Sequence, residues 1–228
     1  MKVIKLPEKI KALIFDMDLT LYTSPEYGQV QIKNLITVAG NERGLSYEEA
    51  NSEIEALRKS YAASHNGKIQ SLSSIFLSWG FTMEENINWR KTSYEPEKYL
   101  TKDEKLRETL LALSHYKLGV ITNNPVLIAE RTLASLGIED LFSALIGLDT
   151  LKIAKPHRLP FVRIMELFND RHENALGEKI DIESAVSIGD RFEVDLEIPL
   201  EMGMGAILVD GVEDVYCLPE ILRKNNGQ

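Results

Sequence analysis

Five short apolar runs, separated by longer polar or amphipathic stretches, constrain the fold of this chain more than any other feature. They are Ala12–Phe15, Leu118–Ile121, Ala144–Leu148, Ala185–Ile188 and Ala206–Val209. Each run is four or five residues long and most lack polar alternation, which is typical of strands covered on both faces. Helical patterns lie between the later runs. This alternation predicts an α/β fold, Rossmann-like and doubly wound, with a parallel five-stranded core sheet.

Three of the helical patterns follow the second, third and fourth runs. Val126–Leu136 carries apolar residues at helical spacing and stops at Gly137, a suitable helix C-cap. Pro160–Phe168 and Leu196–Met202 show the same spacing. These helices are expected to be the crossovers that return the chain between parallel strands.

The alternation is interrupted between the first and second runs. The intervening stretch begins a helix with a capping-box pattern, Ser46-Tyr47-Glu48-Glu49, which continues as an amphipathic segment to Ser64. Further helices are expected over Ile69–Trp79, Met83–Lys91 and Glu104–His115. We therefore predict a helical cap domain over residues 22–96, inserted into an α/β core of residues 1–21 and 97–228.

Composition narrows the classes of partner and compartment. The net charge of −9 and the pI near 5.1 argue against nucleic acid, because proteins that bind it concentrate Lys and Arg. No apolar run is long enough to span a bilayer, so no membrane partner is expected. A single cysteine, Cys217, excludes an internal disulfide and fits a reducing compartment. We expect a cytoplasmic monomer or homodimer that acts on a small molecule.

Polar side chains follow four of the predicted strands, where an open parallel sheet binds its ligands. They are Asp16, Asp18 and Thr20 after the first run, Thr122, Asn123 and Asn124 after the second, Lys155 in a loop after the third, and Asp190 and Asp195 after the fourth. Since the carboxyl ends of parallel strands share one edge, these groups are expected to converge there.

The carboxylates in this set predict a magnesium site. Asp16, Asp18 and Asp190 would repel one another unless a cation lay between them, and oxygen ligands without His or Cys favour Mg²⁺. Two neighbouring carboxylates can also divide labour, with Asp16 as the ionised nucleophile and Asp18 as the general acid. The alternative interpretation is that Asp-x-Asp merely marks a strand-to-turn junction.

The remaining groups fit a phosphate ligand. Thr122 offers a hydroxyl and a backbone N–H at the start of a helix, Asn123 offers an amide, and Lys155 offers a positive charge. Thr122 and its neighbours can also be explained as a helix-entry turn, and Lys155 as a solvated surface lysine.

These residues together carry a family resemblance. The segments Phe15–Tyr22, Ile121–Asn123, Lys155–His157 and Ile188–Asp195 resemble, in order, the four motifs of the haloacid dehalogenase-like hydrolase superfamily. The helical insert lies where the subfamily I cap of that superfamily belongs. The acidic Asp18 argues against the dehalogenases, which lack an acid there, and favours a phosphatase.

The resemblance implies a role for each matching residue. Asp16 would attack phosphorus and become an aspartyl phosphate, and Asp18 would protonate the leaving oxygen and then activate water. Thr122 and Lys155 would bind the phosphoryl oxygens. Asp190 would hold Mg²⁺ with Asp16 and the Asp18 carbonyl, and Asp195 would be a further metal ligand or a nearby carboxylate. Leu19 stands where many relatives have Gly or Asn.

The substrate stays open between two branches of the superfamily. The cap resembles the pyrimidine 5′-nucleotidase-like branch, while Thr122–Pro125 and Leu136–Phe142 fit phosphoglycolate phosphatase-like relatives equally well. Arg58, His65 and Lys68 are the cap residues predicted to contact substrate, and the alternative is an ordinary charged helix surface. A phosphomutase and a non-catalytic, receiver-like phosphate sensor are the competing functions.

Overall fold

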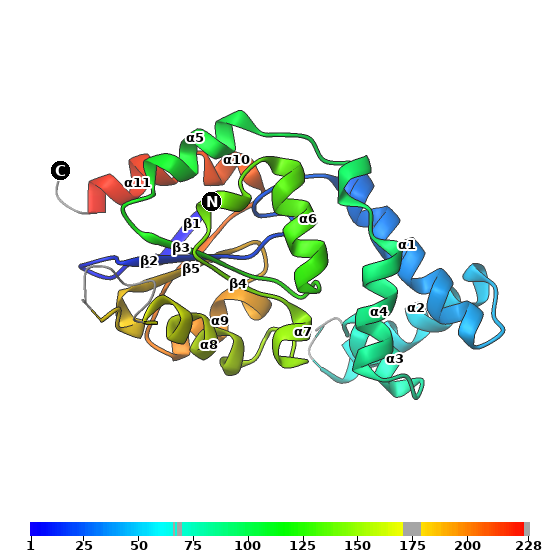
Figure 1. Ribbon diagram of the computed structural model, residues 1–228. Helices are drawn as coiled ribbons and strands as arrows, with labels where there is room; N and C mark the ends of the chain where they lie inside the picture. Colours follow the sequence, from blue (N-terminus) through cyan, green and yellow to red (C-terminus); the bar gives the residue numbers. More distant parts are fainter. Residues whose placement is uncertain (66, 68–69, 171–178, 226–228) are drawn as a thin grey trace. The chain divides into compact units, whose positions relative to one another are not determined.

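The computed structural model describes residues 1–65, 67, 70–170 and 179–225 (Figure 1). The chain forms two compact units. One unit contains Met1–Ser24 and Pro96–Gln228, and the other contains Pro25–Glu95. That these units are a catalytic core domain and a cap domain stays a prediction.

The first unit is built on a mixed sheet with six strands in the described part of the chain. They are β1 (Lys2–Lys5), β2 (Ala12–Phe15), β3 (Lys117–Ile121), β4 (Ala144–Ile146), β5 (Ala185–Gly189) and β6 (Gly205–Leu208). The order across the sheet is β1-β6-β5-β2-β3-β4. Strands β2 to β6 pair in parallel, which confirms the predicted five-stranded core. Strand β1, which was not predicted, adds an antiparallel edge beside β6.

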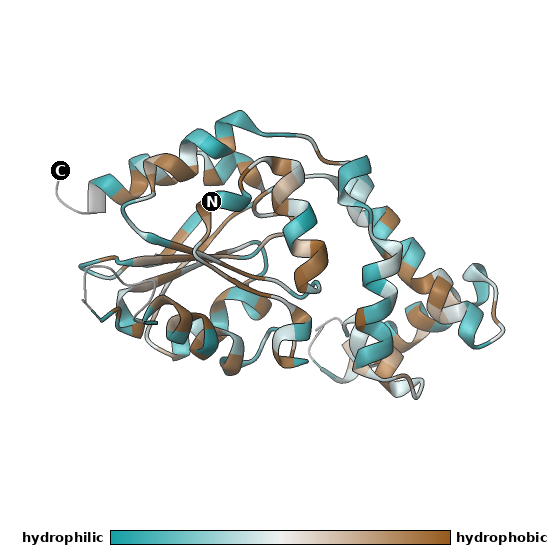
Figure 2. Cartoon of the chain, viewed as in Figure 1, coloured by the Kyte–Doolittle hydropathy of each residue, from teal (hydrophilic) through white to brown (hydrophobic). Residues whose placement is uncertain are grey.

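Helices cover both faces of this sheet. On one face lie α5 (Glu104–Ala112), α10 (Val212–Val215) and α11 (Leu218–Asn225), and on the other lie α8 (Arg158–Phe168) and α9 (Glu197–Glu201) (Figure 1). All four residues of β2 are buried, which explains its lack of polar alternation. Figure 2 shows apolar residues along the strands and on the helices that pack against them.

The crossover helices follow the predicted pattern, with two changes at their ends. Helix α6 (Val126–Leu136) ends at Gly137, whose φ of 72° is left-handed, as predicted for a C-cap. The run predicted as a strand to Leu148 is shorter, because β4 ends at Ile146 and Leu148 begins α7 (Leu148–Leu151). The predicted helix Leu196–Met202 is α9, which is preceded by a π-helical turn over Phe192–Leu196.

The described residues of the second unit form helices joined by turns, without a strand. It contains α1 (Pro25–Glu42), α2 (Tyr47–Ser64), α3 (Leu72–Ser78) and α4 (Met83–Ser93). The predicted capping box is present, with Ser46 accepting from the Glu49 backbone and the Glu49 side chain accepting from the Ser46 backbone. Helix α1 is not among the predicted helices. In the described part of the chain no helix is both long and apolar enough to cross a membrane.

Candidate active site

The strand order brings two predicted carboxylates to one edge of the sheet. Strands β2 and β5 are neighbours, and the Asp16 N–H donates to the Ile188 carbonyl at 2.8 Å. Asp16 is therefore the residue directly after β2, and Asp190 is the residue directly after β5, at the same edge of the sheet. From β2 the chain continues to one side of the sheet through β3 and β4, and then returns to the other side at β5. Such a reversal in strand order opens a crevice at the carboxyl ends.

Lys155 connects Asp16 with Asp195. Its Nζ donates to Asp16 Oδ1 and to Asp195 Oδ1, each at 2.6 Å. All three side chains are no more than 2% exposed. Because little water reaches this cluster, the Lys155 ammonium and the two carboxylates neutralise one another's charge in place of hydration.

Gly189 makes room for this arrangement. A Cβ at Gly189 would lie 2.5 Å from the Cβ of Asp195, well inside contact distance, so Asp195 can approach the end of β5 only because residue 189 has no side chain. The Ser187 hydroxyl donates to the Asp195 carbonyl at 2.8 Å, which ties the π-helical turn that contains Asp195 to β5.

Burial dominates the electrostatics of the cluster. It raises the pKa of the Asp16 carboxyl to about 7; Lys155 lowers this pKa, and Asp195 and Asp18 raise it. Burial likewise raises the pKa of Asp190, with Arg191 opposing it. Burial alone would lower the pKa of the Lys155 ammonium, but Asp16 and Asp195 outweigh that effect and raise it.

The oxygen atoms present fit a divalent cation. Asp16, Asp190 and Asp195 each offer a carboxylate oxygen, and these atoms lie within 4.8 Å of one another. Asp16 Oδ2 and Asp190 Oδ1 are buried and accept no hydrogen bond from the described residues. Hard oxygen donors of this kind are the preferred ligands of Mg²⁺.

Arg191, the residue after Asp190, also faces this cluster. Its backbone N–H donates to Asp195 Oδ2 at 3.1 Å. Its Nε lies 3.6 Å from Asp190 Oδ1 and 3.8 Å from Asp195 Oδ2. The site thus holds four carboxylates, Asp16, Asp18, Asp190 and Asp195, against two cations, Lys155 and Arg191. With all four carboxylates ionised the formal imbalance is two negative charges, and it falls to one when Asp18 carries a proton; a divalent cation would offset either.

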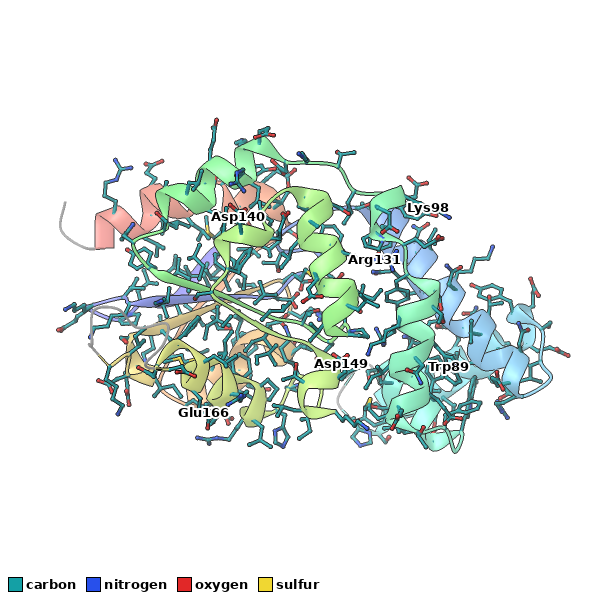
Figure 3. All side chains as sticks on the ribbon, in the orientation of Figure 1. Trp89, Lys98, Arg131, Asp140, Asp149 and Glu166 are labelled. Carbon is teal, nitrogen blue, oxygen red and sulfur yellow. The ribbon has the colours of Figure 1, made fainter. Side chains whose placement is uncertain are left out.

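The loop after β3 carries the predicted phosphate ligands. The Thr122 N–H donates to the Ile146 carbonyl at 2.9 Å, and the residue is buried. Asn123 Oδ1 accepts from the Lys155 N–H at 2.7 Å while its Nδ2 donates to the Lys155 carbonyl at 3.1 Å. In this structure the Asn123 side chain therefore holds the lysine loop. Asp149, which is labelled in Figure 3, accepts from the Val126 N–H at 2.8 Å at the start of α6.

Asp18 is near this cluster but directed differently. Its Oδ1 accepts from the Tyr22 hydroxyl, and its Oδ2 accepts from Asn124 Nδ2 at 2.8 Å. The carboxylate is thus separate from the three that could share a metal. The sequence placed Asn124 at this edge of the sheet and Tyr22 within the first motif, but it predicted no role for either residue.

The predicted cap contacts engage residues of their own unit. Arg58 pairs with Glu55 at 3.2 Å, one turn away on α2. The His65 ring stacks on Tyr61 with ring centres 3.8 Å apart. Lys68 lies outside the described residues. A role for these side chains in substrate binding stays a prediction.

Comparison with known proteins identifies the family. The sequence profile described as haloacid dehalogenase-like hydrolase matches residues 13–209, which include every carboxylate of the site and the insert. The chain belongs to the haloacid dehalogenase-like hydrolase (HAD) family. The predicted family, fold class and enzyme class, a hydrolase, are therefore confirmed.

Curated relatives of this HAD hydrolase are named phosphatases. It is 27% identical over 207 residues to a glyceraldehyde 3-phosphate phosphatase from Pyrococcus abyssi, covering 87% of this chain and 80% of the relative. It is 41% identical over 66 residues to a phosphoglycolate phosphatase from Colwellia psychrerythraea, covering 28% and 29%. The predicted phosphatase class agrees with these names.

Solved structures share the fold. A HAD phosphatase from Thermococcus onnurineus superposes with a TM-score of 0.59 at 20% identity, covering 93% of this chain and 98% of the other. A 2-haloacid dehalogenase from Pseudomonas syringae superposes with a TM-score of 0.56 at 20% identity, covering 95% and 99%. Because one fold serves both chemistries, the side chains at the site must decide between them.

Proposed function

We propose that this HAD hydrolase is a magnesium-dependent phosphatase, which hydrolyses a small phosphate monoester through an aspartyl phosphate on Asp16. The observation that supports it most is the buried Asp16 carboxylate. The Lys155 ammonium holds Asp16 Oδ1 at 2.6 Å, while Asp16 Oδ2, at the end of β2, accepts no hydrogen bond from the described residues. A fixed oxygen anion beside a cation is suited to attack phosphorus, since phosphoryl transfer depends on positioning and charge neutralisation.

The reaction has two displacement steps. In the first, an Asp16 oxygen attacks phosphorus and the ester P–O bond breaks, while the departing oxygen takes a proton from the Asp18 carboxyl. In the second, the Asp18 carboxylate takes a proton from water, whose oxygen attacks the same phosphorus. The bond between phosphorus and Asp16 breaks, which releases inorganic phosphate and restores both carboxyl groups.

The other residues bind and neutralise. The Lys155 ammonium and the Thr122 hydroxyl would bind phosphoryl oxygens, and Asn123 keeps the lysine loop in position through its two hydrogen bonds with the Lys155 backbone. Asp16 and Asp190 would hold Mg²⁺, with the Asp18 carbonyl and with Asp195 as a direct or neighbouring ligand. When bound, Mg²⁺ would neutralise the carboxylates and the charge on the transferring phosphoryl group.

For the substrate we propose a short phosphorylated acid or aldehyde. This proposal rests on two relatives whose names specify glyceraldehyde 3-phosphate and phosphoglycolate. A nucleoside monophosphate is the competing substrate class. A panel of both classes, each assayed for phosphate release, separates them by kcat/KM.

The first experiment measures phosphate release from p-nitrophenyl phosphate with Mg²⁺ and after treatment with EDTA. Turnover is expected only with the metal, because Lys155 and Arg191 do not compensate all of the negative charge of the clustered carboxylates. Replacing Asp16→Asn should lower kcat by more than about ten-thousandfold, as loss of a nucleophile does in other covalent enzymes. Asp181→Asn is the matched control, since Asp181 is exposed and pairs with the exposed Lys179 at 3.3 Å.

Two outcomes contradict the proposal. Wild-type protein that is folded yet inactive on the whole panel with Mg²⁺ rules out the phosphatase. Conversion of a sugar phosphate into its isomer without release of phosphate would favour the mutase alternative. Activity that survives Asp16→Asn removes Asp16 from the reaction.

A further inference from the structure

The surroundings of Asp18 assign roles to two residues that the phosphatase mechanism does not use. Each oxygen of the Asp18 carboxylate accepts a hydrogen bond from a different neutral donor. The Tyr22 hydroxyl donates to Asp18 Oδ1, and Asn124 Nδ2 donates to Asp18 Oδ2 at 2.8 Å. Tyr22 follows β2 and Asn124 follows β3, so the carboxylate is held from two separate loops.

Both donors are themselves firmly placed. Tyr22 is 5% exposed and Asn124 is 3% exposed. The Asn124 N–H donates to Thr122 Oγ1 at 3.1 Å, and its carbonyl accepts from the Leu148 N–H at 2.8 Å. An isolated β-bridge between Asp18 and Tyr22 closes the loop that follows β2. The Asp18 carboxylate is therefore fixed by groups that have little freedom to move.

The two hydrogen bonds keep the Asp18 carboxylate apart from the carboxylates that could bind a metal. Asp18 is only two residues from Asp16, yet its carboxylate is not among the three that lie within 4.8 Å of one another. A free carboxylate in that position would be attracted to any divalent cation held by Asp16 and Asp190. Neutral donors restrain it without adding a charge that would compete with the metal.

We propose that Tyr22 and Asn124 are positioning residues that hold the Asp18 carboxylate in line for proton transfer and away from the metal-binding carboxylates. The inference rests on the proposed phosphatase function and deepens it. Asp18 gives its proton to the departing oxygen and later removes one from water, and both transfers require the carboxyl group to stay beside the phosphoryl group. Proton transfer from a positioned side chain contributes about a hundredfold to ten-thousandfold in rate.

The test uses the double variant Tyr22→Phe with Asn124→Ala, and each single variant. On an alkyl phosphate, whose leaving oxygen needs a proton, kcat of the double variant should fall by about tenfold to a hundredfold, while KM changes by less than about twofold. With p-nitrophenyl phosphate, whose leaving group needs no proton, the first turnover should keep its rate. The phosphoenzyme should then accumulate, because its hydrolysis still requires Asp18 as a base.

Magnesium binding gives a readout that does not depend on turnover. If Tyr22 and Asn124 keep Asp18 off the metal, calorimetry should show tighter Mg²⁺ binding to the double variant by about threefold or more, as one more carboxylate becomes available. Tyr216→Phe is the matched control. The Tyr216 hydroxyl also donates to an aspartate, Asp103 Oδ2, at 2.6 Å, but outside the carboxylate cluster.

The kinetics and the Mg²⁺ affinity decide the inference together, and an unchanged Mg²⁺ affinity in the double variant overturns the claim that Tyr22 and Asn124 keep Asp18 off the metal. A slower alkyl phosphate turnover with a preserved first turnover on p-nitrophenyl phosphate supports it. An equal loss on both substrates, with the first turnover slowed as well, points to a purely structural role and overturns it, as does unchanged kinetics in an active enzyme. If the double variant does not fold, Tyr22→Phe alone, which keeps the ring, is judged by the same criteria. An inactive wild-type enzyme refutes the proposed function and this inference together.

Discussion

Replacing Lys155→Met removes the cation that the buried carboxylates share. Its Nζ lies 2.6 Å from Asp16 Oδ1 and 2.6 Å from Asp195 Oδ1, and its side chain is 2% exposed. Methionine has similar length and volume, so the change mainly removes charge. Removing one partner of a buried ion pair costs about 3–5 kcal/mol, because the remaining charge is left without compensation. We expect a loss of this size in the free energy of unfolding, at about pH 8 and without metal.

The loss should depend on pH with a definite sign. Burial raises the pKa of Asp16 to about 7 and Lys155 opposes that rise, so the pKa is higher still in the variant. An aspartate with a raised pKa binds more protons in the folded protein than in the unfolded one, so stability falls as pH rises. The destabilisation should therefore be greatest at about pH 8 and smaller at about pH 5.5, where Asp16 is protonated.

The assay is urea unfolding followed by far-ultraviolet circular dichroism. Both tryptophans, Trp79 and Trp89, lie in the unit formed by Pro25–Glu95, so their fluorescence would not report on the unit that contains Lys155. Millimolar Mg²⁺ should recover part of the loss, since a divalent cation supplies the missing charge. Catalytic activity should be lost under all conditions.

Lys179→Met is the matched control. Lys179 is 81% exposed and pairs with the exposed Asp181 at 3.3 Å, so its replacement should change stability by no more than about 0.5 kcal/mol. The argument from buried charge is refuted if Lys155→Met costs less than about 1 kcal/mol at pH 8 without metal. It is equally refuted if the loss is the same at both pH values.

Three further changes test the local structure. Gly189→Ala would place a Cβ 2.5 Å from the Cβ of Asp195, and should cost about 1–3 kcal/mol in urea unfolding and much of the activity. Gly137→Ala, at a φ of 72°, should cost about 1–2 kcal/mol, because the left-handed conformation is strained for alanine. Hydrogen bonds from the Thr82 backbone and hydroxyl lower the pKa of Glu85 in the folded protein. The ionised Glu85 side chain therefore stabilises the fold at pH values above its ordinary pKa, and this stabilisation is lost as the pH falls through the lowered pKa of the folded protein. Glu85→Gln keeps a capping side chain but no charge, so its thermal midpoint should fall less between neutral and acid pH than that of the wild type.

The strands were predictable because of where they are buried. Strand β2 is covered on both faces, and such strands are apolar along their length. The bounds predicted from the sequence, Ala12–Phe15, are therefore those of the structure. Strand β1 could not be found in this way, because Lys2–Lys5 is largely exposed and becomes a strand only by pairing with β6, far along the chain. Helix α1 was missed for a related reason. Its sequence contains Gly28 and Gly40, and its burial comes from packing against other helices.

The residues of the candidate site were predictable from their places after strand ends, but their contacts were not. The order of polar groups along the sequence placed Asp16, Thr122, Lys155 and Asp190 at one edge of the sheet. Nothing in the order said that Asn123 would hold the Lys155 backbone, or that Gly189 would make room for Asp195. Those contacts depend on distances between side chains from different loops.

By itself, the sequence determined the family, the parallel core and the set of charged groups that meet at its edge. It did so because strand burial and motif order are properties of local chain segments. Only the tertiary structure decided how those groups share their charges. Lys155 lies between Asp16 and Asp195, and Asp18 turns away to Tyr22 and Asn124. The physical reason is that hydrogen bonds and ion pairs are short-range, so the partner of each carboxylate is fixed only once separate loops are packed together.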